Sequence, residues 1–309
     1  MKAVSENMNL GDLKAFVAVA EAGSVNRAAA RLNLTQPAVS RRVQNLEAAI
    51  GVVLLDRSAK PPTLTEEGRR ALAYGRKVLY AIDDLSSQVG AKGVPEGEFR
   101  LGIAPGFADA ALGHPLDAVM RNFPNINLRI TSDWSGKLLE QLETDSLDAA
   151  FVLLTEPQLV SKDVQLRSFP QDSVVVIAAR RSPLPPSPSI VELGQHPWIL
   201  NPRGCGFRAA LQRTLDRERR HLNLCAEVQG YDIQLSLIAR GVGLGLVPKA
   251  RWKASPYRKD LKILEPHDFR LFVTPAIVTR AGHDRFSPVV DLLASETENA
   301  TRKHNVKAA

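Results

Sequence analysis

The sequence predicts an α/β protein in three parts, and three observations carry this prediction. Three short, capped helices are expected in residues 1–64. A proline-free helical stretch with apolar residues at heptad spacing occupies residues 65–91. Strands and helices then alternate to about residue 300, as in domains built on an α/β sheet. At about 150 residues per domain, the 309 residues have room for two domains and a small third one.

The composition excludes several classes of protein. With 44% hydrophobic and 24% charged residues, the chain is an ordinary globular protein. It has no run of about 18 apolar residues and no apolar signal segment at its start, so we expect a cytoplasmic protein that does not contact a membrane. Two cysteines and six scattered histidines offer no disulfide framework and no metal-ligand spacing. No hydrolase, metalloprotease or P-loop motif occurs, so we expect no catalytic residue, cofactor or metal.

The first part is predicted to hold three helices. Apolar residues recur at three- and four-residue steps over residues 10–20, which predicts a helix that Gly23 ends. Ser24 is the expected N-cap of a short second helix. Thr35 caps a third helix, with Pro37 in its first turn, where a missing N–H costs nothing. Two helices joined by a tight turn are typical of a helix-turn-helix.

The third helix has the side chains that a DNA-reading helix needs. Such a helix presents hydrogen-bonding groups near its N-terminus, where its dipole also favours phosphate. Gln36 and Arg41 have the chemistry to read base edges, and Ser40 can reach a base or the backbone. Arg42 is better placed for phosphate. The alternative is that the two arginines lie on a solvated helix face, but the agreement of helix, turn and cap favours DNA.

A wing is expected after the third helix. The apolar residues 52–55 and the pair Thr63-Leu64 flank a basic turn of sequence DRSAKPP. Two extended segments around such a turn predict a small hairpin. We expect Arg57 and Lys60 in it to lie along the DNA backbone or in the minor groove. Residues 1–64 therefore predict a winged helix-turn-helix DNA-binding domain.

A known pattern matches this part at Phe16, Ala28, Ala29, Leu32, the run from Thr35 to Ser40, Leu46, Glu47, Gly51, Leu54, Arg57, Leu64-Thr65 and Gly68. With these residues the stretch 10–68 resembles the DNA-binding end of LysR-type transcriptional regulators. The resemblance implies that Gln36, Pro37, Ser40 and Arg41 form the recognition end, beside their cap Thr35. The chain departs from the family in two places: Leu55 replaces a usual Phe, and Lys60-Pro61-Pro62 replaces a wing tip that usually contains Arg.

Residues 65–91 predict a long linker helix. Thr65 and two acidic residues suit its start, since they complement the helix dipole. The seam of a two-stranded coiled coil is formed by apolar residues that step by three and four: Ala71, Tyr74, Val78, Ala81 and Leu85. The alternative is that this face packs on its own chain. Resemblance to the family's dimerising helix favours a homodimer, and the family implies further assembly to a homotetramer. Residues 90–97, rich in Gly and Pro, predict a hinge.

Residues 97–300 predict a two-lobed α/β domain. Helices alternate with strands that are expected at 99–103, 127–131, 148–154, 173–179, 198–200, 226–228, 244–247 and 270–279, and a last helix at 287–295 follows. This alternation is typical of a parallel sheet. Two chain crossings place residues 97–168 and 268–300 in lobe 1 and residues 169–267 in lobe 2, with a ligand cleft at the carboxyl ends of the strands. A disordered polar tail is expected from Thr301.

The family resemblance continues over this domain to about residue 295. The blocks at residues 141–152 and 239–248 match those of a periplasmic-binding-protein-like effector domain. Mapped onto this chain, the family's effector contacts fall on Pro105, Gly106, Phe107, Trp134, Ser135, Gly204, Cys205, Gly206, Phe207, Tyr231 and Asp232. Helix starts suit an anion, so we expect a small carboxylate effector, with an aromatic acid among the candidates. The alternative is that the aromatic side chains pack in the core or at the hinge and do not contact an effector. Cys205 also raises the alternative of an oxidant-sensing thiol.

The placement of charge supports DNA as the partner. Of the net charge of +7, residues 1–64 hold only +3, but residues 27–60 carry six basic and two acidic side chains. The leading hypothesis is a transcriptional regulator that binds an imperfect palindrome of double-stranded DNA and is controlled by a small-molecule co-inducer. The alternative is a small-molecule-binding or enzymatic α/β protein without specific DNA binding.

Overall fold

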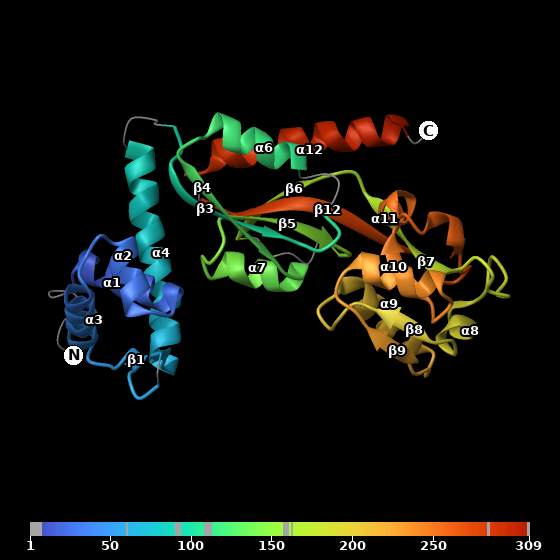
Figure 1. The fold of residues 1–309 in the computed structure, drawn as a ribbon, viewed down its shortest axis with the longest axis horizontal. Coiled ribbons are helices and arrows are strands. Elements are labelled where there is room, and N and C mark those ends of the chain that lie inside the picture. The colour runs from blue at the N-terminus through green and yellow to red at the C-terminus, as the bar shows by residue number, and fades with distance from the viewer. Residues whose placement is uncertain are drawn as a thin grey trace. The chain divides into compact units, whose positions relative to one another are not determined.

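The chain divides near residue 93 into two compact units. The computed structural model describes residues 8–59, 61–89, 94–107, 113–156, 161, 163–282 and 285–307. Figure 1 shows helices and a short strand in the first unit, and a mixed sheet with helices in the second unit. Within the described ranges, no helix is long and apolar enough to cross a membrane.

Side-chain caps and glycines set the helix ends of the first unit. The side chains of Asn9, Ser24 and Thr35 accept backbone N–H groups at the starts of three helices. Gly23 and Gly51 end two of them in the left-handed region. The elements are α1 Leu10–Ala22, α2 Val25–Arg31, α3 Gln36–Ile50, β1 Leu55–Asp56, β2 Thr63–Leu64 and α4 Glu66–Val89. The predicted caps, wing hairpin and linker helix are confirmed.

One hydrophobic core joins these elements. Phe16 of α1, Val39 and Leu46 of α3, and Leu54 before β1 are all buried in it. The linker helix α4 joins this core where Gly75 lies against α1, because a Cβ there would come within 2.9 Å of the Leu13 side chain. A residue without a side chain therefore brings α4 close to α1.

A mixed sheet organises the second unit (Figure 1). Its strands run in the order β10-β7-β12-β5-β3-β4, with β11 added on β7 and β6 added on β12. The strands are β3 Gly97–Ile103, β4 Ile126–Ser132, β5 Ala149–Leu154, β6 Val164–Ser168, β7 Asp172–Ala179, β10 Gly245–Pro248, β11 Leu261–Leu264 and β12 Leu271–Arg280, and a separate pair is β8 Trp198–Leu200 with β9 Leu224–Glu227.

The expectation of a parallel sheet is wrong for much of this sheet. β3 runs parallel to β4 and β5, but β12 runs antiparallel to β5, β6 and β7. The first residues of β12 pair with β7, and those from Thr274 onwards pair with β5 and β6. β12, along which the chain returns from one half of the unit to the other, is thus shared by the two halves. It runs from the half that contains β7 into the half that contains β5, and it is antiparallel to the strands it pairs with in both.

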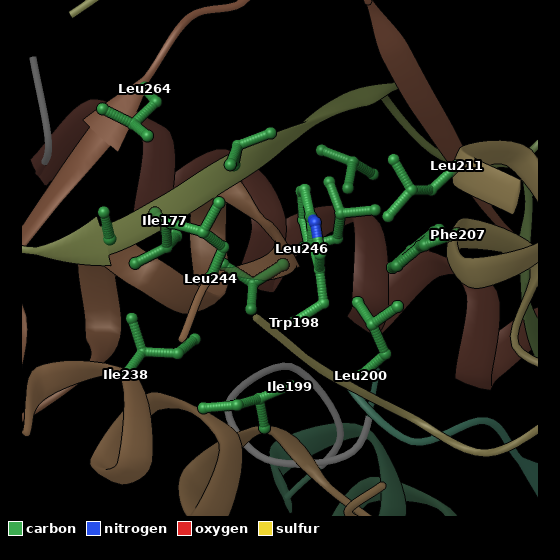
Figure 2. Close-up of a cluster of buried hydrophobic side chains, with 14 of the residues drawn as sticks. Ile177, Trp198, Ile199, Leu200, Phe207, Leu211, Ile238, Leu244, Leu246 and Leu264 are labelled. Carbon is green, nitrogen blue, oxygen red and sulfur yellow. The ribbon is translucent and has the colours of Figure 1, made fainter. Parts of the chain in front are cut away.

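Helices cover both faces of the sheet. In the half that contains β3 and β5, α6 and α12 lie on one face and α7 on the other (Figure 1). The other half has a core around Trp198 (Figure 2). The indole N–H of Trp198 donates to the Leu193 carbonyl at 3.0 Å. The helices are α6 Gly113–Asn122, α7 Ser135–Glu143, α8 Ile190–Gly194, α9 Gly206–Arg217, α10 Tyr231–Ala239, α11 Lys249–Ala254, the short 3₁₀ turn η2 Arg258–Asp260 and α12 Ser287–Lys307.

Two further differences from the expected elements have local causes. β6, β11, α8 and α11, each four to six residues long, were not predicted, because their mixed polar and apolar residues form no periodic pattern. The expected disordered tail from Thr301 is wrong over residues 301–307, since α12 runs on to Lys307. No Gly or Pro interrupts the sequence there, and the hydroxyl groups of Thr297 and Thr301 donate to backbone carbonyls one turn earlier.

Candidate DNA-binding surface and effector site

The recognition helix α3 buries one side and exposes the other. Val39 and Val43 are buried against the core of the first unit. Gln36, Pro37 and Arg41 are exposed together with the cap Thr35, while Ser40 is half-buried. The exposed side therefore carries most of the predicted base-reading residues. Gln44 and Asn45, which the sequence analysis did not select, are exposed as well, and Gln44 lies one turn beyond Ser40.

The two neighbouring arginines of α3 have different environments. Arg41 is exposed and makes no hydrogen bond or ion pair within the described ranges. The guanidinium of Arg42 is turned towards α1, where its Nη1 lies 3.4 Å from the Gly11 carbonyl. Arg41 therefore has all its donors available to a DNA base, whereas Arg42 also ties α3 to the start of α1.

A buried carboxylate ties the wing to the recognition helix. Glu47 of α3 accepts the backbone N–H groups of Leu54 and Leu55 on Oε1, at 2.9 and 3.2 Å, while its Oε2 accepts Arg57 Nη2 at 2.7 Å. The Glu47 side chain is only 9% exposed. Burial raises its pKa, but these hydrogen bonds and the positive charge outweigh burial, so the pKa of Glu47 is lowered. Glu47 is ionised at neutral pH.

This arrangement gives Arg57 a structural contact that the sequence did not predict. One edge of its guanidinium pairs with Glu47, and about half of the side chain stays exposed. The other predicted wing residue, Lys60, lies outside the described residues. The signal for Glu47 was present in the sequence, because it is an acidic residue one turn after the apolar Val43, on the side of the helix that faces the core.

The structure brings several predicted effector residues together across the second unit. Gly106 follows β3 with φ of +92°, and a Cβ on it would come within 2.4 Å of the Tyr231 ring at the start of α10. Gly204 has a φ of +102° and lies against Trp134. A Cβ added to Gly204 would be 3.7 Å from the nearest atom of the Trp134 indole. Both glycines thus allow an aromatic ring to touch the backbone. Pro105, beside Gly106, is half-buried.

Other predicted effector residues have packing roles in this structure. Phe107 packs on the tilted ring of Phe151 and edge-on against Phe169, at ring-centre distances of 4.8 and 5.8 Å, and Phe207 belongs to the core around Trp198. The Ser135 hydroxyl both donates to the Leu153 carbonyl and accepts its N–H. For Phe107 and Phe207, these contacts agree with the alternative that the aromatic side chains pack in the hydrophobic core.

Burial dominates the electrostatics around Cys205 and Tyr231. Both residues are buried, and burial raises the pKa of the Cys205 thiol and of the Tyr231 hydroxyl. Cys205 is therefore a neutral thiol at neutral pH, which does not favour an oxidant-sensing role. Arg251 lies over the Tyr231 ring at 5.8 Å, and its Nη2 is 3.3 Å from a carboxylate oxygen of the exposed Asp232. Arg251 was not predicted, because α11 itself was missed.

Two helix starts in this region lack side-chain caps. No side chain caps α9, which begins after Cys205, or α10, which begins after Gly230. Gly230 N–H donates to the side chain of the buried Asn201 at 3.2 Å, so Asn201 holds the start of α10 in place. Thr155, at the end of β5, lies against Gly206 of α9. Neither Asn201 nor Thr155 was predicted.

Comparison with known families identifies both units. The model described as "Bacterial regulatory helix-turn-helix protein, lysR family" matches residues 10–69, and that described as "LysR substrate binding domain" matches residues 92–298. The chain belongs to the LysR family. As a LysR-type transcriptional regulator it combines a helix-turn-helix that binds DNA with a domain that binds small-molecule effectors, and members of the family oligomerise.

Curated relatives of this LysR-type regulator are regulators too. HTH-type transcriptional regulator YofA of Bacillus subtilis is 26% identical over 284 residues, which cover 88% of this chain and 96% of YofA. HTH-type transcriptional activator CmpR of Synechocystis is 27% identical over 272 residues, which cover 86% of this chain and 87% of CmpR. The expectation of a regulator rather than an enzyme is confirmed by these matches.

Solved structures show the same fold. A full-length OxyR variant of Pseudomonas aeruginosa matches with a TM-score of 0.77 and 22% identity, and the match covers 94% of each chain. Full-length CbnR in complex with its target DNA matches with a TM-score of 0.58 and 22% identity, covering 95% of this chain and 100% of CbnR. The predicted architecture of a winged helix-turn-helix, a linker helix and an α/β effector domain is confirmed.

Proposed function

We propose that this LysR-type regulator reads an imperfect palindrome through α3 and is controlled by a small carboxylate bound in its α/β unit. The exposed side of α3 is the observation that carries the first half of the proposal. It presents Gln36 and Arg41 with no competing partner in the described part of the chain, beside a wing that Glu47 holds in place. Side chains of this kind near a helix N-terminus read base edges in the major groove.

Replacing Arg41 with alanine tests this proposal. We expect ten- to hundredfold weaker binding, since a bidentate base contact is worth about 1–3 kcal/mol. We also expect weaker discrimination between the DNA beside the protein's own gene and unrelated DNA. Gel shifts on both duplexes measure the two effects. Lys60→Ala is the comparison, because a phosphate contact weakens binding to both DNAs alike. Unchanged discrimination in Arg41→Ala would show that α3 does not read the bases.

A dimer through α4 is the second element of the proposal. Tyr74, Val78 and Leu85 are 68%, 47% and 62% exposed, so they do not pack on their own chain. Ala81 is exposed with them. Exposed apolar residues repeated along one helix face are suited to a second copy of that helix. The dimer sets the half-site spacing, and a homotetramer in the cytoplasm is the further assembly that we propose.

Lysine on this face of α4 is expected to separate the protomers. Val78→Lys with Leu85→Lys places charges in the proposed seam, and we expect the dimer dissociation constant to rise about a hundredfold or more. Ala73→Lys on another side of the helix is the control. Light scattering gives the mass, and circular dichroism checks that α4 stays helical. A double variant that keeps the wild-type mass would exclude α4 as the interface.

The effector site is proposed around the contacts of Gly106 with Tyr231 and of Gly204 with Trp134. The uncapped starts of α9 and α10 offer backbone N–H groups to a carboxylate. Tyr231, Trp134, Cys205 and the backbone of Pro105 surround these groups in the proposed site, with Ser135 and Asp232 at its margin. The same proposal includes the domain division. A DNA-binding domain at residues 1–64 and a linker at 65–91 are followed by lobe 1, at 97–168 and 268–300, and by lobe 2, at 169–267.

A further inference from the structure

Within the second unit, the positive charge is concentrated in residues 169–267. Residues 169–267 contain 15 Lys+Arg and 8 Asp+Glu. Their net charge of +7 equals that of the whole chain, so the remaining residues balance at 25 of each sign. Residues 94–309 as a whole contain 27 Lys+Arg and 24 Asp+Glu, a net charge of only +3, so the positive charge of the second unit is gathered in one part of it and calls for an explanation there.

Much of this charge gathers at one end of the sheet, in a group of six side chains that we call the β7-end cluster: Arg180, Arg181, Arg240, Arg258, Lys259 and Lys262. Arg180 and Arg181 follow β7 directly. Arg240 lies at the end of α10, and Arg258 and Lys259 lie in η2. Lys262 lies in β11, which pairs antiparallel with β7. Five of the six are exposed and Lys262 is half-buried.

Backbone carbonyls, rather than carboxylates, hold three of these six cations in place. Arg180 Nε donates to the Lys259 carbonyl and Arg181 Nη2 to the Arg240 carbonyl, each at 2.6 Å. Lys262 Nζ donates to two carbonyls in the loop after β7, at 2.7 and 2.8 Å. A carbonyl orients a cation without neutralising it, so the cluster keeps its full charge while its side chains lose little freedom on binding.

Acidic partners are scarce around the cluster. Asp260 of η2 adds one carboxylate, and within the described ranges no member of the cluster forms an ion pair. Elsewhere in the same unit, arginines pair with acids, as Arg100 does with Asp148 and Arg208 with Glu227. Arg258 lies over the Trp252 ring at 5.0 Å, which fixes another of the six side chains.

We propose that the β7-end cluster binds the phosphate backbone of the DNA that the helix-turn-helix holds. A preorganised group of arginines and lysines with unneutralised charge suits phosphate oxygens and carries no sequence information. DNA is favoured because it is the polyanion that the same protein already binds, so the cluster meets it at high effective concentration. The inference rests on the proposed function, since it adds contacts to a complex that α3 forms.

The double variant Arg240→Gln/Lys259→Gln tests the cluster. Neither side chain has a hydrogen bond or ion pair in the described part of the protein, so the fold is kept. The slope of log K against log salt concentration is measured for the full-length protein, on operator DNA that extends several helical turns beyond the site. We expect the slope to become shallower by about 1–2, because each lost phosphate contact removes about 0.9. Between about 50 and 200 mM salt, the wild type then loses about tenfold more affinity than the variant.

A matched control separates the cluster from net charge. Arg121→Gln/Arg217→Gln removes the same charge from exposed positions on α6 and α9, where neither side chain has a hydrogen bond or ion pair in the described ranges, and is expected to keep the wild-type slope. The loss in the cluster variant is expected to be the same on unrelated DNA, unlike the loss in Arg41→Ala. Equal slopes for the wild type and the cluster variant would overturn the proposal, and an acidic protein partner for the cluster would give that result. A wild type that binds no DNA would overturn the proposed function as well.

Discussion

Replacing Glu47 with alanine is expected to unfold the wing and abolish operator binding. The variant leaves the N–H groups of Leu54 and Leu55 and one edge of Arg57 without their acceptor, at a side chain that is only 9% exposed. Each of the two backbone N–H groups left without a partner costs about 1–3 kcal/mol, and the half-exposed Arg57 loses its ion pair. Hydrogen exchange of the segment after α3 measures the loss directly, since all three tryptophans lie in the second unit and do not report on the wing.

Two further variants define this effect. Glu47→Gln keeps an oxygen that can accept an N–H but loses the charge, so we expect a smaller cost of about 1–3 kcal/mol. Glu67→Ala removes an exposed carboxylate from the first turn of α4, in the same unit, and is expected to change wing exchange little. If Glu47→Ala exchanged as slowly as Glu67→Ala, the Glu47 carboxylate would not hold the wing.

The lowered pKa of Glu47 gives this contribution a defined pH dependence. The pKa of Glu47 in the folded protein lies below its ordinary value of 4.5. A carboxylate with a lowered pKa stabilises the fold above its unfolded-state pKa and loses that contribution as the pH falls through the folded-state pKa. We therefore expect the protection difference between wild type and Glu47→Gln to be full at neutral pH and to disappear in acid. A difference that grew in acid would contradict the assignment.

Replacing Gly106 with alanine is expected to destabilise the effector unit by about 2–5 kcal/mol, as the sum of two costs. The φ of +92° strains any residue with a side chain, and the new Cβ would lie 2.4 Å from the ring of Tyr231. That ring is only 3% exposed and has little room to move. Urea unfolding followed by tryptophan fluorescence measures the loss, because Trp134, Trp198 and Trp252 all lie in this unit.

Gly113→Ala is the matched control for Gly106→Ala. Gly113 begins α6 in open space, with nothing within 4 Å of an added Cβ. An alanine there is expected to leave stability unchanged or slightly higher. If the two variants had the same midpoint of urea unfolding, Gly106 would not lie in close contact with the Tyr231 ring.

The same pair of variants tests the effector site. In a thermal-shift screen of small carboxylates and phenols, a ligand of the proposed site raises the melting temperature of the wild type and of Gly113→Ala. It is expected to raise that of Gly106→Ala much less, because the added methyl group displaces the Tyr231 ring. A ligand that stabilises all three proteins equally would bind elsewhere.

Much of the fold could be predicted because its signals are local. Thr35 and Pro37 mark the start of α3 within a single turn, and Gly51 marks its end. The strand Trp198–Leu200 was predicted residue for residue from its apolar run. β11 and α11 were missed, because in segments of four to six residues with mixed polar and apolar side chains no periodic pattern stands out, whereas Trp198–Leu200 is an unbroken apolar run.

The sequence by itself determined the DNA-binding helix, its cap and the family to which the protein belongs. It assigned Arg41 to base edges and Arg42 to phosphate, but it did not show that Arg42 reaches the Gly11 carbonyl, that Glu47 holds Arg57 or that Tyr231 lies on Gly106. Only the tertiary structure decided these contacts. Caps and periodicities act over three or four residues of one segment, whereas these contacts depend on how separate segments pack against one another.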